Sequence, residues 1–180
     1  LFGIKIEYKK TIFTREEVRH IIKESGETGV LADGEHKLLH RVFELNDKFA
    51  KEVMVPRDKI VAINADMGQD DIVRIITEEG HTRYPVYRHS IDNVIGIIHS
   101  KAIINMLINN PLFVLEDLMM EPYFVPEDKE ISKILAEFQQ KGLHVAIVKD
   151  TQGAVSGLIQ IKDILKVIFG ELTEKTIPDL

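Results

Sequence analysis

One stretch of this chain is written twice, and that repetition limits the possible folds more than any other feature. The first copy, GHTRYPVYRHSIDNVIGIIHSKA, spans residues 80–102, and the second, KGLHVAIVKDTQGAVSGLIQIKD, spans residues 141–163. The register follows from three pairs at a constant spacing of 61 residues: Tyr84 and Val145, Gly96 and Gly157, and Lys101 and Lys162. A constant spacing with matched chemistry is the mark of an internal repeat. We therefore expect two units with the same fold.

Each copy reads as an apolar strand, a polar turn, a second apolar strand, a glycine and a helix. Together with the segments upstream, the pattern predicts an α+β fold of two βαββα-type repeats. At about 55 residues and two or three strands each, neither repeat is expected to be stable alone. We therefore expect them to pack sheet to sheet as a pseudo-symmetric pair. The predicted organisation is an extended arm and helical lead-in over residues 1–50, a first repeat over 51–111, a second repeat over 112–172 and a tail over 173–180.

Capping and turn rules predict the boundaries of these elements. Thr14 and Glu17 have the spacing of a capping box at the start of the first helix. The segments KEVMVP (51–56) and LMMEP (118–122) are expected to open the two repeats. The other predicted boundaries are Gly26 and Gly80 as helix ends, Asp66 as a helix N-cap, Asp92-Asn93 and Gln152-Gly153 as turns, and Pro111 as a helix stop.

Composition and charge exclude several classes of function. The net charge of −6 weighs against a nucleic-acid partner, which needs a basic face. The chain has no Cys, so it has neither a disulfide framework nor a thiolate site. No run approaches the roughly 18 apolar residues of a transmembrane helix. Because the chain begins at Leu1 rather than Met, we expect it to be a soluble piece of a longer protein.

Three segments carry a resemblance to a known family. They are EVMVPRDKI at residues 52–60, GHTRYPVY at 80–87 and DNVIGIIHSKAII at 92–104. Together they resemble the tandem cystathionine-β-synthase (CBS) domain pair of the CorC/HlyC/CNNM-type membrane proteins, also labelled haemolysin-like. The helical lead-in resembles the segment that joins their transmembrane domain to that pair. The likeness covers residues 1–172, and the combination of VMVPR with RYPVY is specific among CBS pairs.

The resemblance implies a function that the residues alone do not show. Full-length members have a transmembrane domain upstream and are linked to Mg²⁺ and Co²⁺ homeostasis. Their CBS pairs bind adenosine nucleotides, ATP or AMP, in the cleft between the repeats, and form homodimers. We therefore expect a regulatory nucleotide-binding module on the cytoplasmic face of a membrane, with Mg²⁺ carried on the phosphates. The expected partners are a second copy and the transmembrane domain of the same chain, with no nucleic acid.

A nucleotide site needs an apolar slot for the base, an acceptor for the ribose hydroxyls and donors for the phosphates. Asp163, in the first turn of a helix, is the candidate ribose acceptor, and Gly157 would let backbone approach the ligand closely. Arg83 has a planar guanidinium suited to phosphate oxygens, and by resemblance it matches the arginine that meets the polyphosphate of ATP. Each charged residue has a plainer alternative: Asp163 as part of a helix start, and Arg83 as a surface residue paired with an acid.

The base pocket rests on the resemblance. Val55 and Pro56 match the motif that lines it in the family. Tyr84 and Pro85 either form a wall of the pocket or belong to the core, and both alternatives stay open.

Two departures from the family pattern bear on the site. Gln160 stands where the family has a Thr that contacts the nucleotide, and its longer side chain can either hydrogen-bond or fill the cleft. In the first repeat, His99 takes the Thr position and Ala102 the Asp position, so that half-site has no carboxylate for a ribose. We therefore predict at most one competent site per module, built on Asp163 and Arg83. The alternative is a nucleotide-independent dimerisation scaffold with a decayed site.

The sequence contains no set of residues typical of an enzyme. His36 and His40 have the i, i+4 spacing of metal ligands, but no Glu and no third ligand accompany them. A solvated helix face is therefore expected at these histidines. Neither a phosphate-binding G-x-x-x-x-G-K-[ST] loop nor a nucleophile elbow occurs. We predict no catalytic residues, no metal ligands and no enzymatic activity.

Overall fold

The computed structural model describes residues 13–109 and 114–170. The chain divides into two compact units, Leu1–Glu44 and Leu45–Leu180. The predicted N-terminal arm up to residue 12, Pro111, and the tail over 173–180 lie outside the described residues.

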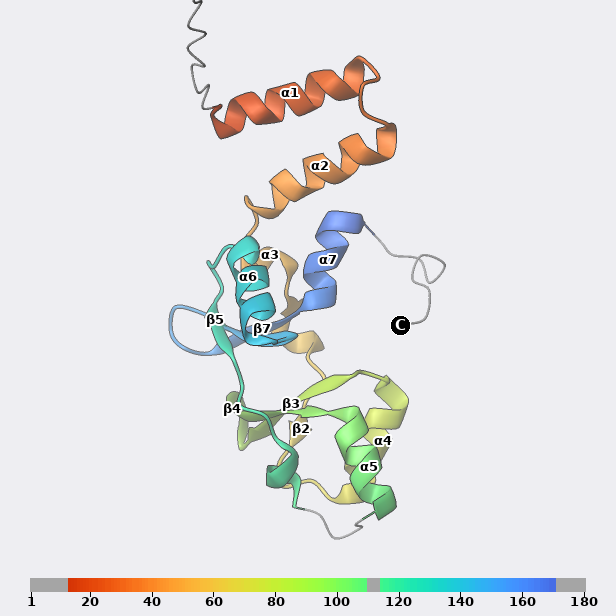
Figure 1. The fold of residues 1–180 in the computed structure, drawn as a ribbon. Coiled ribbons are helices and arrows are strands. Elements are labelled where there is room, and N and C mark those ends of the chain that lie inside the picture. Colours follow the sequence, from red (N-terminus) through yellow and green to blue (C-terminus); the bar gives the residue numbers. More distant parts are fainter. Residues whose placement is uncertain (1–12, 110–113, 171–180) are drawn as a thin grey trace, which may run out of the picture. The chain divides into compact units, whose positions relative to one another are not determined.

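The first unit is built from two helices, α1 (Arg15–Glu27) and α2 (Asp33–Leu45), drawn in red and orange in Figure 1. The predicted capping box at the start of α1 is confirmed. The Thr14 amide donates to Glu17 Oε2 at 2.6 Å, and the Glu17 amide donates to Thr14 Oγ1 at 3.2 Å. Two amides that a helix start leaves without helical partners are thereby satisfied.

The prediction that Gly26 ends this first helix is wrong. α1 continues to Glu27, and the chain turns at Gly29, whose φ of 72° is left-handed. Gly26 instead faces α2, because a Cβ at this position would lie 2.5 Å from Cδ2 of His36. The glycine therefore allows close contact between the two helices.

The second unit contains both repeats (Figure 1). The elements up to the end of the first repeat are α3 (Ala50–Val53), β1 (Val55–Pro56), η1 (Arg57–Lys59), β2 (Ile63–Asn64), α4 (Gln69–Glu79), β3 (Arg83–Arg88), β4 (Ser90–His99) and α5 (Ser100–Asn109). Those of the second repeat are η2 (Leu115–Leu118), β5 (Phe124–Pro126), α6 (Ile131–Lys141), β6 (Val145–Lys149), β7 (Val155–Gln160) and α7 (Ile161–Phe169). In the first repeat β2 runs parallel to β3, and β3 runs antiparallel to β4. In the second repeat β5 runs parallel to β6, and β6 runs antiparallel to β7. The predicted α+β fold of two like repeats is confirmed.

Three clusters of buried side chains form the core of the second unit. One lies within the first repeat and includes Ile63, Tyr84 and Ile98, and another lies mainly within the second repeat and includes Ile134 and Phe138. The third takes residues from both sheets: Val94, Ile97, Val145, Ile147, Val155 and Leu158. Each fully buried side chain of this size contributes about 1.5–3 kcal/mol. The expected packing of the two sheets against each other is confirmed by this shared cluster.

The segments that open the repeats are exchanged between the sheets. β1 belongs to the segment that opens the first repeat, yet it pairs antiparallel with β7 of the second, placing Val55 opposite Leu158. Met120 belongs to the segment that opens the second repeat, and it forms a bridge to Ile97 in β4 of the first, with two backbone hydrogen bonds of 2.9 Å. Each sheet is therefore extended by the segment expected to open the other repeat.

The matched glycines of the repeat make this exchange possible. A Cβ on Gly96 would lie 2.5 Å from Met119 Sδ, and one on Gly157 would lie 2.7 Å from the backbone oxygen of Val55. The repeat conserves these glycines internally because a neighbouring segment crosses directly over each of them.

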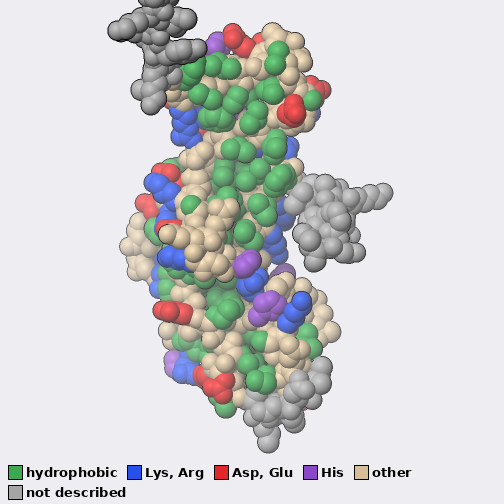
Figure 2. Space-filling view, viewed as in Figure 1, with side chains coloured by type: hydrophobic (Ala, Val, Ile, Leu, Met, Phe, Trp, Pro, Cys, Tyr) green, Lys and Arg blue, Asp and Glu red, His purple; other side chains and the backbone are tan. Residues whose placement is uncertain are grey.

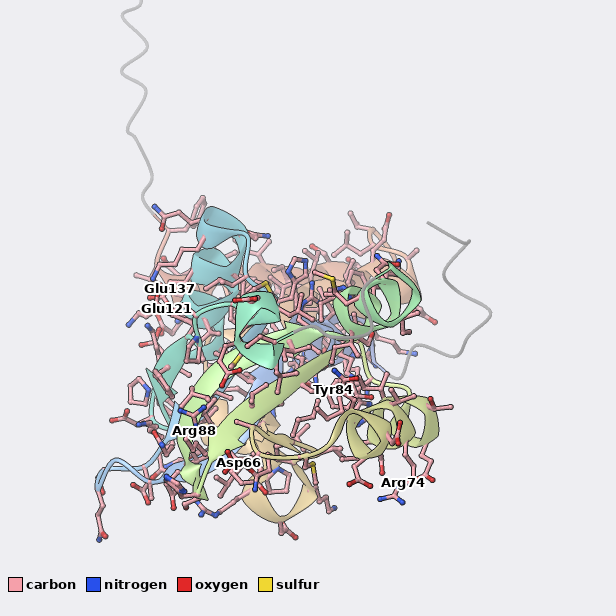
Figure 3. The ribbon with its side chains drawn as sticks, turned by 90° about the horizontal axis from the view of Figure 1, so that it is seen from below. Asp66, Arg74, Tyr84, Arg88, Glu121 and Glu137 are labelled. Atoms are coloured by element: carbon pink, nitrogen blue, oxygen red, sulfur yellow. The ribbon has the colours of Figure 1, made fainter. Side chains whose placement is uncertain are left out.

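One predicted helix start is wrong. α4 begins after Gly68, whereas Asp66 lies in the turn that follows β2 (Figure 3). There the Asp66 amide donates to Asn64 Oδ1 at 3.1 Å. The end of α4 is as predicted, since Gly80 is its left-handed C-cap with φ of 63°.

The predicted turn of the first hairpin is also displaced. Asp92-Asn93 lie within β4, and the chain reverses around His89, which has a left-handed φ of 66°. In the second hairpin the turn falls at Gln152-Gly153 as predicted, and Gly153 has φ of 84°. The first hairpin therefore reverses earlier than the repeat alignment indicates, and Asp92 becomes available for a contact described below.

Candidate functional site

A cavity of about 200 Å³ lies where β1, the start of β3 and the end of β7 meet. Four of the predicted site residues line it: Val55, Arg83, Pro85 and Gln160. The other lining residues are Lys59, Ile60, Val61, His81, Leu158 and Lys162. The cavity exists because β1 crosses to the sheet of the second repeat, which brings Val55 beside β7.

The cavity is cationic. Lys59 reaches it from η1, Arg83 from β3 and Lys162 from α7, and His81 adds a titratable ring. Within residues 13–109 and 114–170, no ion pair engages these three cations. Basic and histidine side chains also gather on one face where the two repeats meet (Figure 2). Convergent cations without acid partners are suited to an anionic ligand, with the guanidinium fork matching phosphate oxygens.

Asp163 does not line this cavity, although its neighbours Gln160 and Lys162 do. Its side chain is only 9% exposed, and its Oδ2 accepts the Gln160 amide at 3.0 Å. Gln160 is the N-cap residue of α7, so this bond satisfies a backbone amide at the start of that helix. The plainer alternative for Asp163, a helix-start residue, is therefore realised, and its contact with a ribose stays a prediction.

Tyr84 belongs to the core and does not line the cavity. Its side chain is fully buried among the apolar residues of the first repeat (Figure 3). Its hydroxyl accepts the His81 amide at 2.8 Å and donates to the Ile76 carbonyl at 3.4 Å. Burial raises the pKa of Tyr84. Of the two alternatives left open, the core holds for Tyr84, whereas Pro85 does line the cavity.

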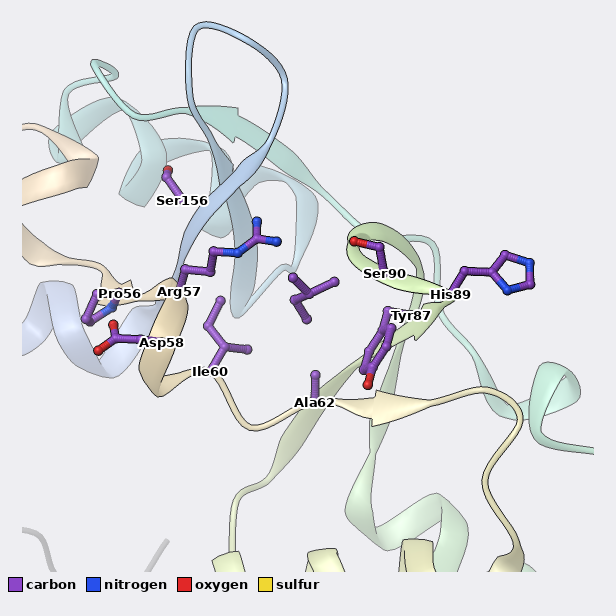
Figure 4. Close-up of a pocket in the computed structure, with 10 residues that line it drawn as sticks. Pro56, Arg57, Asp58, Ile60, Ala62, Tyr87, His89, Ser90 and Ser156 are labelled. Carbon is purple, nitrogen blue, oxygen red and sulfur yellow. The ribbon is translucent and has the colours of Figure 1, made fainter.

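Pro56 and Gly157 lie opposite each other in the β1–β7 pairing, outside the set that lines the cavity. The close approach that Gly157 allows is that of Met54 and the Val55 backbone. Pro56 instead lines a wider depression of about 760 Å³, together with Arg57, Tyr87 and other residues (Figure 4). Their predicted contact with a nucleotide is untested.

Beside that depression, Arg57 and Asp92 form a contact between the repeats. Arg57 donates through both terminal nitrogens to the Asp92 carboxylate, with Nη2 at 2.8 Å from Oδ2. Arg57 also donates to the Val155 carbonyl at 2.6 Å, and the Val155 amide donates to Asp92 Oδ1 at 2.8 Å. The hydrogen bonds from Arg57, and then from Val155, hold the pKa of Asp92 well below its ordinary value. The displaced turn of the first hairpin thus places a carboxylate against the sheet of the second repeat.

A smaller cleft of about 130 Å³ occupies the matched place on the other side of Arg83. Arg83 lines both clefts, and His144 and Glu121 line only the smaller one. His144 is the repeat equivalent of Arg83, since the two are 61 residues apart. This cleft corresponds to the half-site in which the sequence predicts no nucleotide.

His99 lies directly opposite Arg83 in the β3–β4 pairing. Its Nδ1 accepts the Lys101 amide at 3.1 Å, so the ring caps the start of α5. Burial, followed by the charges of Arg83, Lys101 and His144, lowers the pKa of His99 from its ordinary value of 6.5.

Sequence reasoning missed the cations that accompany Arg83. Lys162 had a signal, because it forms a matched pair with Lys101 in the repeat. Lys59 and His81 had none, since only the pairing of strands distant in sequence brings them to the cavity.

The described residues contain no group of three or more His, Asp or Glu side chains arranged to hold a metal ion. Nor does any described helix have the length and hydropathy to cross a membrane.

The model of the CBS domain family matches residues 50–109 and 115–170. The chain belongs to the CBS-domain family. The chain is 34% identical over 181 residues to UPF0053 protein YrkA of Bacillus subtilis, covering 97% of this chain and 42% of that relative. It is 33% identical over 162 residues to the magnesium and cobalt efflux protein CorC of Pasteurella multocida, covering 89% of this chain and 54% of that relative. The chain therefore spans about half the length of these curated relatives.

Solved structures of similar CBS domains agree with this assignment. The CBS domain of the bacterial CNNM/CorC family Mg²⁺ transporter, in complex with the inhibitor IGN95a, superposes with a TM-score of 0.84 at 29% identity, covering 89% of this chain and 100% of that one. The ATP complex of a CBS domain of the same description gives 0.72 at 31% identity, covering 77% and 99%. A CBS-domain pair with bound AMP from Klebsiella pneumoniae gives 0.58 at 32% identity, covering 68% and 98%. The resemblance read from the sequence is confirmed at the level of the family.

Proposed function

We propose that this CBS pair binds an adenine nucleotide, ATP or AMP, in the cleft between its repeats. The observation that carries the proposal is the convergence of Lys59, Arg83 and Lys162 on one cavity, with no ion-pair partner among the described residues. Val55 and Leu158 supply apolar surface for a base beside these cations. Mg²⁺ accompanies the nucleotide on its phosphates. The ATP and AMP complexes of similar CBS domains support this class of ligand.

The nucleotide acts as a regulatory signal, and the module is not an enzyme. The relatives include magnesium and cobalt efflux proteins and a CNNM/CorC family Mg²⁺ transporter. By this relationship the CBS pair lies on the cytoplasmic face of a membrane and regulates the transmembrane domain of its own full-length chain. Regulation requires that the nucleotide bind two states of the module with different affinity.

Two copies of the module associate as a homodimer. Ile104 on α5 and Phe169 on α7 support this, because they leave 47% and 50% of large apolar side chains exposed. Sedimentation velocity measures the oligomeric state. Replacement of both residues by Glu is expected to shift a dimer to monomers, since charges are costly to bury in an interface.

The alternative function is a dimerisation scaffold that needs no nucleotide. It is favoured by the capping role of Asp163, whose Oδ2 is already bonded to the Gln160 amide. It is also favoured by Gln160, whose long side chain lines the cavity where the family has Thr.

Thermal unfolding with ATP, ADP and AMP, each with and without Mg²⁺, separates the two functions. A nucleotide that binds the folded module raises its midpoint in a dose-dependent way, by the free energy RT ln(1 + [L]/Kd). Arg83→Gln is the diagnostic variant, because it removes the cation that lines both clefts. The loss of the Arg83 guanidinium should weaken nucleotide binding roughly tenfold to a hundredfold, as expected for the loss of a hydrogen bond to a charged group. A midpoint that stays constant for all three nucleotides would identify the scaffold.

A further inference from the structure

His99 lies where its charge depends on what binds against Arg83. The two residues face each other across the β3–β4 pair, and directly opposed side chains on one sheet face approach to about 5 Å between Cβ atoms. The ring is half-buried and accepts the Lys101 amide through Nδ1. In the free protein this bond requires an unprotonated Nδ1, so it favours the neutral imidazole.

The charged groups around the ring also favour its neutral form. Arg83 faces it from β3, Lys101 from α5 and His144 from the start of β6. Glu121 is the acidic residue of the adjoining cleft, which Arg83 and His144 also line. Burial, followed by the charges of the three basic neighbours, lowers the pKa of His99. The imidazole is therefore neutral at pH 7 while no anion is bound.

A bound phosphate chain reverses this balance. Phosphate oxygens held by Arg83 bring at least one full negative charge close to the ring, and an opposite charge nearby favours the protonated form. We propose that His99 takes up a proton at Nδ1, which releases the Lys101 amide, when the phosphates of the nucleotide bind against Arg83, so that the CBS pair binds nucleotide more tightly as the pH falls. The inference rests on the proposed function, because it concerns the same ligand.

The proposed link between proton uptake and nucleotide binding involves a residue of the first repeat alone. In the second repeat the matched residue is Gln160, which caps α7 and cannot titrate. Replacing His99 with Gln therefore copies a residue that the protein already uses at this position. The variant places at the start of α5 the residue found at the matched N-cap position of α7, and it removes the proton site.

The direction in which nucleotide affinity changes with pH follows from the linkage between proton uptake and binding. Binding takes up protons in the pH range between the lowered pKa of His99 in the free protein and its raised value in the complex. Affinity rises as the pH falls through the value of the complex, and levels off below that of the free protein. A change of one pKa unit on binding corresponds to about tenfold in affinity.

Titration calorimetry with ATP tests the proposal at pH 8 and pH 6, in pairs of buffers with different ionisation enthalpies. The buffer dependence of the binding enthalpy counts the protons taken up. ATP itself titrates in this range, because the second ionisation of a phosphate group has a pKa of about 6. The informative quantity is therefore the difference in proton uptake between each variant and the unchanged chain, because the contribution of ATP itself is the same for all of them. His20→Gln, a change at an exposed histidine of α1, should behave as the unchanged chain does.

We expect His99→Gln to take up fewer protons than the unchanged chain and His20→Gln. Its gain in affinity between pH 8 and pH 6 should be smaller by up to about tenfold. Equal proton uptake by His99→Gln and the unchanged chain overturns the inference while leaving nucleotide binding intact. Absence of ATP binding at both pH values overturns the proposed function and this inference together.

Discussion

At the scale of single residues, the carboxylate of Asp163 makes one contact in the structure and one in the proposed complex. In the structure its Oδ2 accepts the backbone amide of Gln160 at the start of α7, and the residue is buried. Gln160 extends from that cap to the cavity that Arg83 lines. Gln160 therefore connects the cavity to the start of α7, because it lines the cavity and its amide donates to Asp163.

Asp163→Ala is expected to abolish ATP binding and to lower the free energy of unfolding by about 1 kcal/mol, the usual cost of a lost cap. Asp163→Asn is the matched control, because its amide oxygen can still accept the Gln160 amide. We expect it to keep most of the stability and to weaken ATP binding, since a neutral group is a poorer acceptor for ribose hydroxyls. Calorimetry and thermal unfolding measure the two effects. An unchanged affinity in Asp163→Ala would show that the ribose acceptor lies elsewhere.

Asp92 gives a prediction about pH at the same scale. Its pKa is lowered in the folded protein by Arg57 and Val155, so its stabilising effect is present above the unfolded pKa, near 3.8, and is lost as the pH falls below it. Asp92→Asn should therefore unfold at a lower temperature than the unchanged chain at pH 7. The difference should shrink towards pH 3.

Asp66→Asn is the control for this comparison, because Asp66 is exposed and does not cap α4. Thermal unfolding monitored by circular dichroism at pH 7 and pH 3 measures each difference. A difference for Asp92→Asn that persists unchanged at pH 3 would mean that its charge is not the source of the stability.

At the scale of elements, each repeat has a glycine where a segment of the other repeat crosses its sheet. The two glycines, Gly96 and Gly157, differ in how well the crossing segment can accommodate a larger side chain. β1 crosses Gly157 with both a Met54 side chain and the Val55 backbone, whereas Gly96 faces only the side chain of Met119 among its nearest neighbours. The Sδ and Cγ atoms of both methionines can move with a change of rotamer, whereas Met119 Cβ and the Val55 oxygen move only with the backbone. The backbone of Val55 is held in the β1–β7 pairing, whereas Met119 lies outside the strands.

Gly157→Ala should therefore destabilise the protein by about 1–3 kcal/mol, the usual cost of overpacking. Gly96→Ala, its counterpart in the first repeat, should cost less, because the backbone of Met119 is not held in a strand pairing. Urea unfolding of both variants measures the difference. Equal losses would indicate that the exchanged segments tolerate displacement equally.

At the scale of the whole molecule, the shared apolar cluster makes the two repeats of the second unit interdependent. It takes Val94 and Ile97 from β4, and its remaining fully buried members from β6 and β7. The Arg57–Asp92 contact joins the same sheets at their hairpin ends. Repeats of this size lack enough core to be stable separately, so we expect them to unfold together.

Ile147→Ala tests that expectation in the centre of the shared cluster. Its side chain is fully buried, and its loss should cost about 2–5 kcal/mol while leaving a single transition. Val114→Ala, at a side chain that is 55% exposed, should cost almost nothing. Calorimetric and van't Hoff enthalpies of the second unit's transition test whether it is single. Two transitions, of which only one responds to Ile147→Ala, would show that the repeats unfold independently.

The sequence alone determined the repeat, its strands and helices, and the α+β class. Local rules were sufficient for the capping box at Thr14, the left-handed end of α4 at Gly80 and the helix after each matched glycine. These features depend on residues a few positions apart, so the sequence pattern shows them directly. The family resemblance followed from the same local segments.

Only the tertiary structure decided which segments and side chains meet. β1 pairs with a strand about a hundred residues further along the chain, and that pairing brings Lys59 and Lys162 to the cavity of Arg83. Burial likewise assigned Tyr84 to the core and Asp163 to a helix cap, although the sequence allowed a site role for each. The physical reason is that long-range pairing and burial depend on the whole packed chain, and local residue patterns do not encode a partner's distance or direction.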